Sequence, residues 1–207
     1  MRPRTHGLEA FPMPSSATSR YNGLAMSLHW LIAALLVTNI GLAWYFDDLK
    51  GLAKIPPVQL HKSIGITVLL LSLIRLVWRF MAPPPPLPRS VEGWARFAAG
   101  AAYVLFYVVM IGMPLSGWAL SSASVIIRFK PITLYGLIPW PTIAPLAHLP
   151  PDQMKAAHDA FVNVHESLAY LAYGLIVLHV GAALRHLFLL RDGVMGRMVP
   201  FLRAPAL

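Results

Sequence analysis

Four histidines lie inside or at the ends of long apolar segments of the chain. They are His29, His61, His165 and His179. An imidazole is costly to place in an apolar environment unless a partner satisfies its ring nitrogens. Within membranes, the chemistry that most often needs paired imidazoles is the axial ligation of haem iron. These histidines therefore raise the hypothesis of a redox-active membrane protein.

The composition is that of an integral membrane protein. Hydrophobic residues make up 57% of the 207 positions and charged residues only 12%, about half the charged share of a soluble domain. The chain has no cysteine, which excludes disulfides, iron–sulfur clusters and haem attached through cysteine. Metal chemistry in this chain must therefore use histidine.

Four apolar segments are long enough to cross a bilayer, which takes about 20 residues per helix. They cover residues 26–46, 60–80, 94–120 and 161–190, with a proline-rich link at 82–88 and a single sizeable loop at 121–160. This pattern predicts an all-α fold, a four-helix transmembrane bundle.

The bundle is expected to form one domain over residues 21–200. Residues 1–20 contain arginines but no continuous apolar stretch, so they are predicted to be a disordered cytoplasmic extension. Residues 201–207 are predicted to be a short tail.

The basic residues predict the orientation of the bundle. Six of the 17 lysine and arginine residues would lie on the outer side: Lys50, Lys54, Lys62, Arg128, Lys130 and Lys155. All the others fall on the side of the termini, so the positive-inside rule predicts cytoplasmic N- and C-termini in a bacterial inner membrane. This distribution also explains most of the net charge of +9 without a nucleic-acid partner.

The helix order assigns a depth to each histidine. His29 begins an outward helix and lies near the cytoplasm, whereas His61 begins an inward helix and lies near the outer surface. His165 and His179 are fourteen residues apart in the last segment, which is about 21 Å and nearly four whole helical turns. One helix face would thus supply His179 to a site with His29 and His165 to a site with His61, each pair holding one b-type haem.

Each histidine also has a simpler interpretation. A single histidine near a helix end, such as His29 or His61, is often an interfacial residue bonded to water or backbone, whereas His179 lies well within a segment. His186 is a candidate quinone partner or an ordinary interfacial histidine. Glu166 and His158 are further candidates for proton transfer to a quinone, although His158 falls in the predicted loop.

An ordered set of short motifs resembles the prokaryotic cytochrome b561 family over residues 20–200. The motifs are Met26-Ser27-Leu28-His29-Trp30, Leu60-His61-Lys62-Ser63-Ile64-Gly65, Arg75-Leu76-Val77-Trp78-Arg79, Met113-Pro114-Leu115-Ser116-Gly117-Trp118 and His165-Glu166-Ser167-Leu168-Ala169 followed by Leu178-His179. The resemblance implies a four-helix inner-membrane protein with two haems, in which His29, His61, His165 and His179 are the axial ligands.

The resemblance also implies an activity. It indicates an enzyme of the superoxide:ubiquinone oxidoreductase type, which oxidises periplasmic superoxide and passes the electrons to ubiquinone. The six outer basic residues would attract the anion, although nearby outer acids partly cancel their field.

Two alternatives remain open. The chain could be a quinol-linked electron-transfer subunit that serves a periplasmic redox protein, docked on the loop 121–160. It could also bind no haem and act as a transporter or scaffold.

Overall fold

The computed structural model describes residues 20–86, 93–202 and 204, without the side chain of Arg128. Its main elements are four long helices: α1 (Gly23–Asp47), α2 (Ile55–Met81), α3 (Gly93–Ser122) and α5 (Pro151–Arg185). Each is long and apolar enough to cross a membrane. The predicted all-α four-helix bundle is thereby confirmed, whereas the predicted extension lies outside the described residues except for Arg20.

Local sequence signals explain where the helices begin and end. The Asn22 side chain accepts a hydrogen bond from the Ala25 N–H (2.9 Å) and caps α1. The turn η1 (Gly51–Lys54) leads into α2, whose first turn contains Pro56 and Pro57, positions that need no backbone donor. Helix α2 ends at Met81, directly before the proline-rich link, because residues that precede proline disfavour the helical conformation.

The predicted start of the last helix at residue 161 is wrong. Helix α5 begins at Pro151, so the loop predicted for 121–160 ends at Pro150. His158 consequently lies on a helix and not in the loop. Half of the first ten residues of α5 are charged or polar, so hydropathy does not reveal this part of the helix, and proline is well tolerated at the first helical position.

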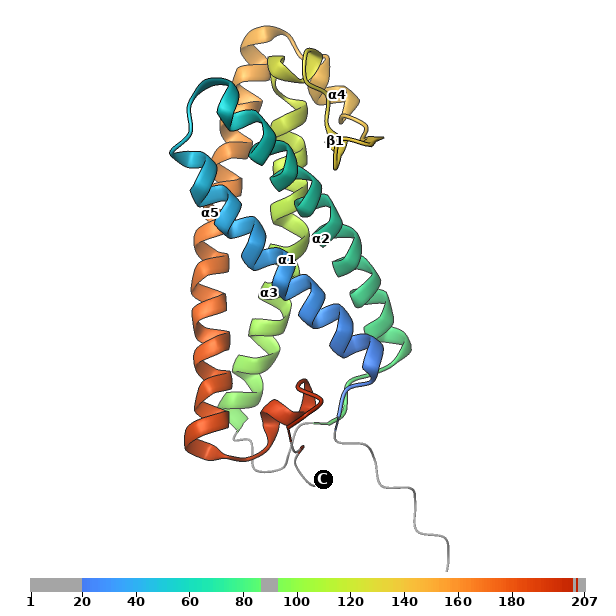
Figure 1. Ribbon diagram of the computed structural model, residues 1–207, viewed down its shortest axis with the longest axis vertical. Helices are drawn as coiled ribbons and strands as arrows, with labels where there is room; N and C mark the ends of the chain where they lie inside the picture. Colours follow the sequence, from blue (N-terminus) through green and yellow to red (C-terminus); the bar gives the residue numbers. More distant parts are fainter. Residues whose placement is uncertain (1–19, 87–92, 203, 205–207) are drawn as a thin grey trace, which may run out of the picture.

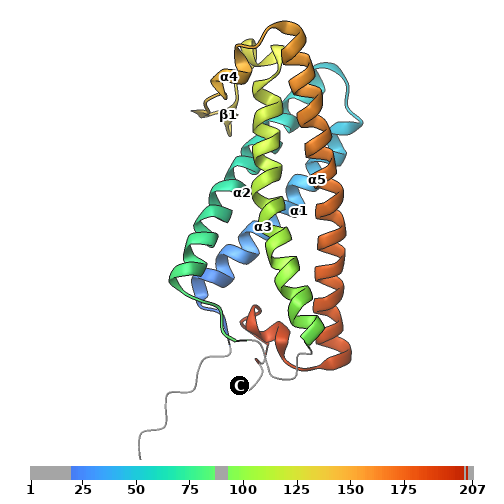
Figure 2. The same ribbon diagram turned by 180° about the vertical axis from the view of Figure 1, so that it is seen from behind.

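The helices pack as two pairs. Helix α1 packs against α2 and α3 against α5, and contacts between α2 and α3 join the pairs. In Figures 1 and 2, α1 and α2 cross the other two helices obliquely and diverge from them toward the end that carries the described termini. The buried core is small, as expected for helices whose other faces contact lipid.

The end of the bundle away from the described termini, called the outer end below, is covered by the segment between α3 and α5, called the outer cap. It contains the turn η2 (Val125–Arg128), the antiparallel strands β1 (Thr133–Leu134) and β2 (Ile138–Pro139), and the short helix α4 (Ala144–Ala147). The turn between the strands places Tyr135 and Gly136 at positive φ. Figure 1 shows this hairpin projecting beside α2.

The opposite end, which carries the described termini and is called the inner end below, is covered by the C-terminal segment. A π-helical turn, η3 (His186–Leu190), follows α5, and the chain then reverses through η4 (Val194–Arg197). Arg20 donates hydrogen bonds to the carbonyls of Pro200 (2.6 Å) and Leu202, and the Trp30 indole donates to Met198 O (2.9 Å). These bonds attach the C-terminal segment to the start of α1.

Candidate functional site

Two of the predicted histidines meet near the inner end of the bundle. His29 of α1 faces His179 of α5 with ring centroids 6.2 Å apart and planes at 70°. Trp30 contacts the His29 ring and Phe106 contacts the His179 ring, each at 5.3 Å between centroids. We refer to His29 and His179 as the inner pair.

The other two histidines meet in the same way near the outer end. His61 of α2 faces His165 of α5 at 6.3 Å between centroids, again with planes at 70°. Phe46 contacts His61 with perpendicular ring planes and 5.3 Å between centroids. We refer to His61 and His165 as the outer pair; the structure therefore brings together the two pairs that the depth argument predicts.

Hydrogen bonds from neighbouring helices orient the outer pair. His61 Nδ1 lies 3.1 Å from the backbone oxygen of Asn39, and His165 Nδ1 lies 3.1 Å from the backbone oxygen of Met113. Because a carbonyl oxygen only accepts, each Nδ1 carries the proton and each Nε2 keeps a free lone pair. Such support fixes the tautomer of a metal-binding imidazole.

Gly117 allows the His165 ring to lie against α3. A Cβ at this position would be 3.2 Å from His165 Cε1 and 3.5 Å from Nδ1. The Ser116 hydroxyl, 3.0 Å from the same Nδ1, closes the contact. In the sequence, Ser116 and Gly117 stand out only as part of a motif. Their contact with His165 could not be predicted, because it depends on the close approach of α3 to α5.

The spacing of both pairs fits two imidazoles on one metal ion. Two bonds of about 2 Å from metal to nitrogen, with about 1 Å from each nitrogen to its ring centre, place the centres about 6 Å apart. Within the described residues, no group of three or more histidine, aspartate or glutamate side chains is placed to hold an ion. The donor set thus suits axial ligation from two sides better than a tetrahedral or octahedral site.

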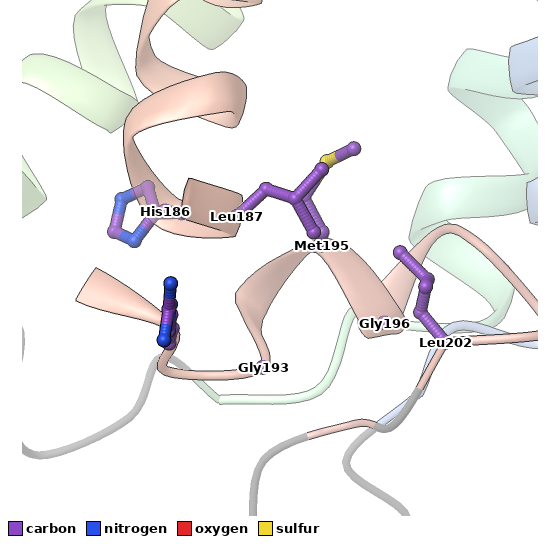
Figure 3. Close-up of a pocket in the computed structure, with 7 residues that line it drawn as sticks. His186, Leu187, Gly193, Met195, Gly196 and Leu202 are labelled. Atoms are coloured by element: carbon purple, nitrogen blue, oxygen red, sulfur yellow. The ribbon is translucent and has the colours of Figure 1, made fainter. Parts of the chain in front are cut away.

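A fifth predicted histidine, His186, lies beside a pocket at the inner end. His186 Nδ1 is 2.6 Å from Asp192 Oδ2, and both side chains are about three-quarters buried. The pocket has a volume of about 190 Å³ and is lined by His186, Leu187, Arg191, Gly193, Met195, Gly196 and Leu202. Figure 3 shows the His186 imidazole at one end of it, with Met195 and Leu202 farther along.

The remaining candidates for proton transfer lie toward the outer end of α5. His158 is half-buried, and its Nδ1 lies 2.9 Å from Leu120 O. Glu166 is exposed on the helix surface, next to His165 in the chain but on another face. Neither residue lines the pocket at His186.

The six outer basic residues differ in their relation to the outer pair. Lys54 Nζ lies 5.6 Å from the centre of the Phe46 ring that contacts His61, and Lys62 follows His61 directly on α2. Lys155 is bonded to Asp159 at 2.5 Å, which offsets its charge. Lys50 and Lys130 are exposed, and the Arg128 side chain lies outside the described residues.

The chain is similar to known cytochromes over most of its length. The family model described as prokaryotic cytochrome b561 matches residues 20–201. The chain is 32% identical to cytochrome b561 homolog 2 of Escherichia coli (strain K12) over 192 residues, 89% of this chain and 94% of that protein.

Two further relatives match over a similar length. The chain is 28% identical to the probable superoxide oxidase CybB of Yersinia pestis, covering 87% of this chain and 96% of the relative. It is also 28% identical to cytochrome b561 homolog 1 of Escherichia coli (strain K12), covering 88% and 98%. The chain therefore belongs to the prokaryotic cytochrome b561 family and is a membrane b-type cytochrome for electron transfer.

Proposed function

We propose that the inner and outer histidine pairs are the axial ligands of two b-type haems and that the protein oxidises superoxide and reduces ubiquinone. The observation that carries this proposal is the spacing of 6.2 Å and 6.3 Å between paired rings at two depths of one bundle. The name of the CybB relative supports superoxide as the substrate.

When bound, the two haems supply one-electron storage at two depths of the membrane. The balanced reaction consumes two superoxide anions, one quinone and two protons, and yields two dioxygen molecules and one quinol. Superoxide loses one electron each time, so quinone reduction requires two successive events. The residues of the chain contribute anion attraction at the outer end and proton supply at the quinone.

Lys54 and Lys62 are the proposed anion-attracting residues, because Lys54 lies over the Phe46 ring that contacts His61 and Lys62 interacts electrostatically with His61. Stopped-flow mixing of the oxidised protein with superoxide tests this role through the rate of haem reduction. We expect reduction faster than spontaneous dismutation, and a rate about threefold lower in the K54Q/K62Q double variant at low ionic strength.

The K155Q/D159N double variant is the matched control, because it removes both members of an ion pair and leaves the net charge unchanged. The control should react at the rate of the unmodified protein. Haem reduction no faster than dismutation would refute superoxide oxidation, and an equal loss of rate in K155Q/D159N would refute the specific role of Lys54 and Lys62.

The pocket at His186 is the proposed site of the quinone headgroup. It offers an imidazole, supported by Asp192, to donate a proton to a quinone oxygen, and apolar side chains to contact the ring. His186 follows His179 by seven residues on one helix, a rise of about 10 Å. We expect D192N to slow quinol formation while superoxide still reduces the haems; unchanged quinol formation would exclude this site.

A second candidate function is electron transfer to or from a periplasmic redox protein, without superoxide activity. The observation in its favour is the exposed apolar surface of the outer cap, where Phe129 and Leu137 are 85% and 83% exposed. Rapid reduction of the haems by quinol together with slow reaction with superoxide would favour this function.

We also propose that both termini face the cytoplasm of a bacterial inner membrane. The excess of arginine at the end that carries α1's start and α5's end supports this orientation. A C-terminal fusion to a reporter that is fluorescent only in the cytoplasm should fluoresce, whereas activity of a C-terminal periplasmic phosphatase reporter would contradict the orientation.

A further inference from the structure

Two arginines and two tyrosines gather between α2 and α3 near the inner pair. Arg75 lies on α2 with the Tyr107 hydroxyl of α3 within hydrogen-bonding reach of its guanidinium. One turn later, Arg79 Cζ stacks 3.7 Å from the centre of the Tyr103 ring. The rings of Tyr103 and Tyr107 touch at 4.9 Å between centroids, so the four side chains form one group, the Arg–Tyr cluster.

The cluster carries two positive charges without a carboxylate. The ion pairs found among the described residues are Lys155 with Asp159 and His186 with Asp192, and neither includes Arg75 or Arg79. Besides its contact with the Tyr107 hydroxyl, Arg75 donates a hydrogen bond to Ala25 O at 2.6 Å, although a guanidinium has five donors. Unpaired cations in a membrane helix are costly, and such residues usually mark a ligand or an ion path.

The position of the cluster indicates which anion it meets. Arg75 is six residues, or about 9 Å, from the end of α2 and interacts electrostatically with His29 of the inner pair. Protohaem carries two propionate carboxylates on one edge of its ring. A planar arginine fork matches a carboxylate with two parallel hydrogen bonds, and a tyrosine hydroxyl adds a further donor.

We propose that the Arg–Tyr cluster binds the two propionates of the haem held by the inner pair. One propionate then accepts hydrogen bonds from Arg75 and Tyr107. The other accepts them from Arg79 and Tyr103. This inference rests on the proposed haem ligation by His29 and His179. It goes further by naming the residues that fix the rotation of the haem about the axis between its ligands.

The experiment compares R75Q, R79Q and the R75Q/R79Q double variant with R75K and with R185Q. R185Q removes an exposed arginine at the inner end of α5 and serves as the matched control. Two properties are measured on the full chain: the rate at which each haem transfers to excess apomyoglobin, and the midpoint potential of each haem by optical redox titration.

We expect the double variant to lose the inner haem about tenfold faster than the unmodified protein, because charge-assisted hydrogen bonds are lost. The potential of the inner component should fall, since nearby cations stabilise the reduced form, while the outer component stays unchanged. R75K should show a smaller effect, and R185Q none. Unmodified protein loaded with haem dimethyl ester should release it as fast as the double variant releases haem.

Two results would overturn the inference. Arg75 and Arg79 variants that keep both haems with unchanged transfer rates and potentials would show that the cluster does not bind the propionates, while the proposed haem ligation would still hold. A His29→Ala variant that keeps both haem components would refute the ligation itself, and with it this inference.

Discussion

At the scale of single residues, hydrogen bonds and a close backbone contact fix the position of the His165 ring. Its Nδ1 faces Met113 O and Ser116 Oγ, and its Cε1 lies against Gly117. Replacing Gly117 by alanine would place a methyl group 3.2 Å from Cε1. The ring cannot shift easily because its hydrogen bonds fix it.

We therefore expect G117A to weaken haem retention at the outer pair by about 1–3 kcal/mol, the usual cost of overpacking. The visible spectrum of the purified variant should show a reduced or shifted outer component and a normal inner one. Gly100 is the control, because a Cβ at that position of α3 meets nothing within 4 Å. An equal effect of G100A and G117A would show that backbone propensity, and not ring contact, is responsible.

The sequence could predict which histidines pair but not how they are oriented. Depth follows from helix direction and from the fourteen residues between His165 and His179, both of which the sequence contains. The groups that orient the outer pair are the backbone carbonyls of Asn39 and Met113. Every residue has such a carbonyl, so the residue types at these positions do not predict the hydrogen bonds. Their role depends on helix packing, which appears only in three dimensions.

At the scale of elements, helix α5 supplies one histidine to each pair. His165 and His179 are fourteen residues apart on α5 and project from nearly the same side, while His158 precedes them on the same helix and His186 follows in η3. Hydropathy predicted the apolar part of this helix and missed its first ten residues, half of which are charged or polar. The two-residue strands of the outer hairpin were equally beyond prediction, because they are too short for an alternating pattern.

The outer hairpin depends on Ser63 of α2. The buried Ser63 hydroxyl accepts a hydrogen bond from the Tyr135 N–H (2.9 Å) and lies 3.1 Å from Thr133 O. Replacing Ser63 by alanine leaves a buried N–H without its acceptor, at a cost of about 1–3 kcal/mol. We expect the outer cap of the S63A variant to be cut faster by limited proteolysis, with both haems retained.

Ser167 provides the comparison for this prediction. It is an exposed helix serine that bonds only to Asn163 O of its own helix (2.7 Å). S167A should be digested at the rate of the unmodified protein. Equal protection of S63A and S167A would mean that the hairpin is held mainly by other contacts, such as the bond between Tyr135 and Thr67.

At the scale of the whole molecule, the C-terminal segment bonds to the residues that flank α1 and α2 at the inner end. Arg197 is buried and donates to Pro85 O (2.5 Å) and Pro86 O (2.9 Å) in the link after α2, while its own backbone oxygen accepts from Tyr21 N (3.2 Å). Arg197 thus connects the C-terminal segment to the residues just before α1 and just after α2, and these two helices diverge from α3 and α5 at this end (Figure 2).

We expect R197Q to lower the free energy of unfolding in detergent by about 2 kcal/mol, because two carbonyl groups lose a charged donor. Thermal unfolding followed by circular dichroism measures this change, with R185Q as the exposed control. The inner haem spectrum should also shift, since Trp30 contacts both His29 and the C-terminal segment. Identical unfolding of the two variants would show that the C-terminal segment contributes little to closure.

The central claim is that two histidine pairs each hold one haem, and haem counting in single-histidine variants tests it most directly. The purified protein should contain two b-type haems per chain by pyridine haemochrome assay, both low-spin by electron paramagnetic resonance. H61A and H165A should each lose the same outer component, and H29A and H179A the same inner one. Loss of one shared component by H61A and H29A, or a stoichiometry below two in the unmodified protein with adequate haem supply, would contradict the claim.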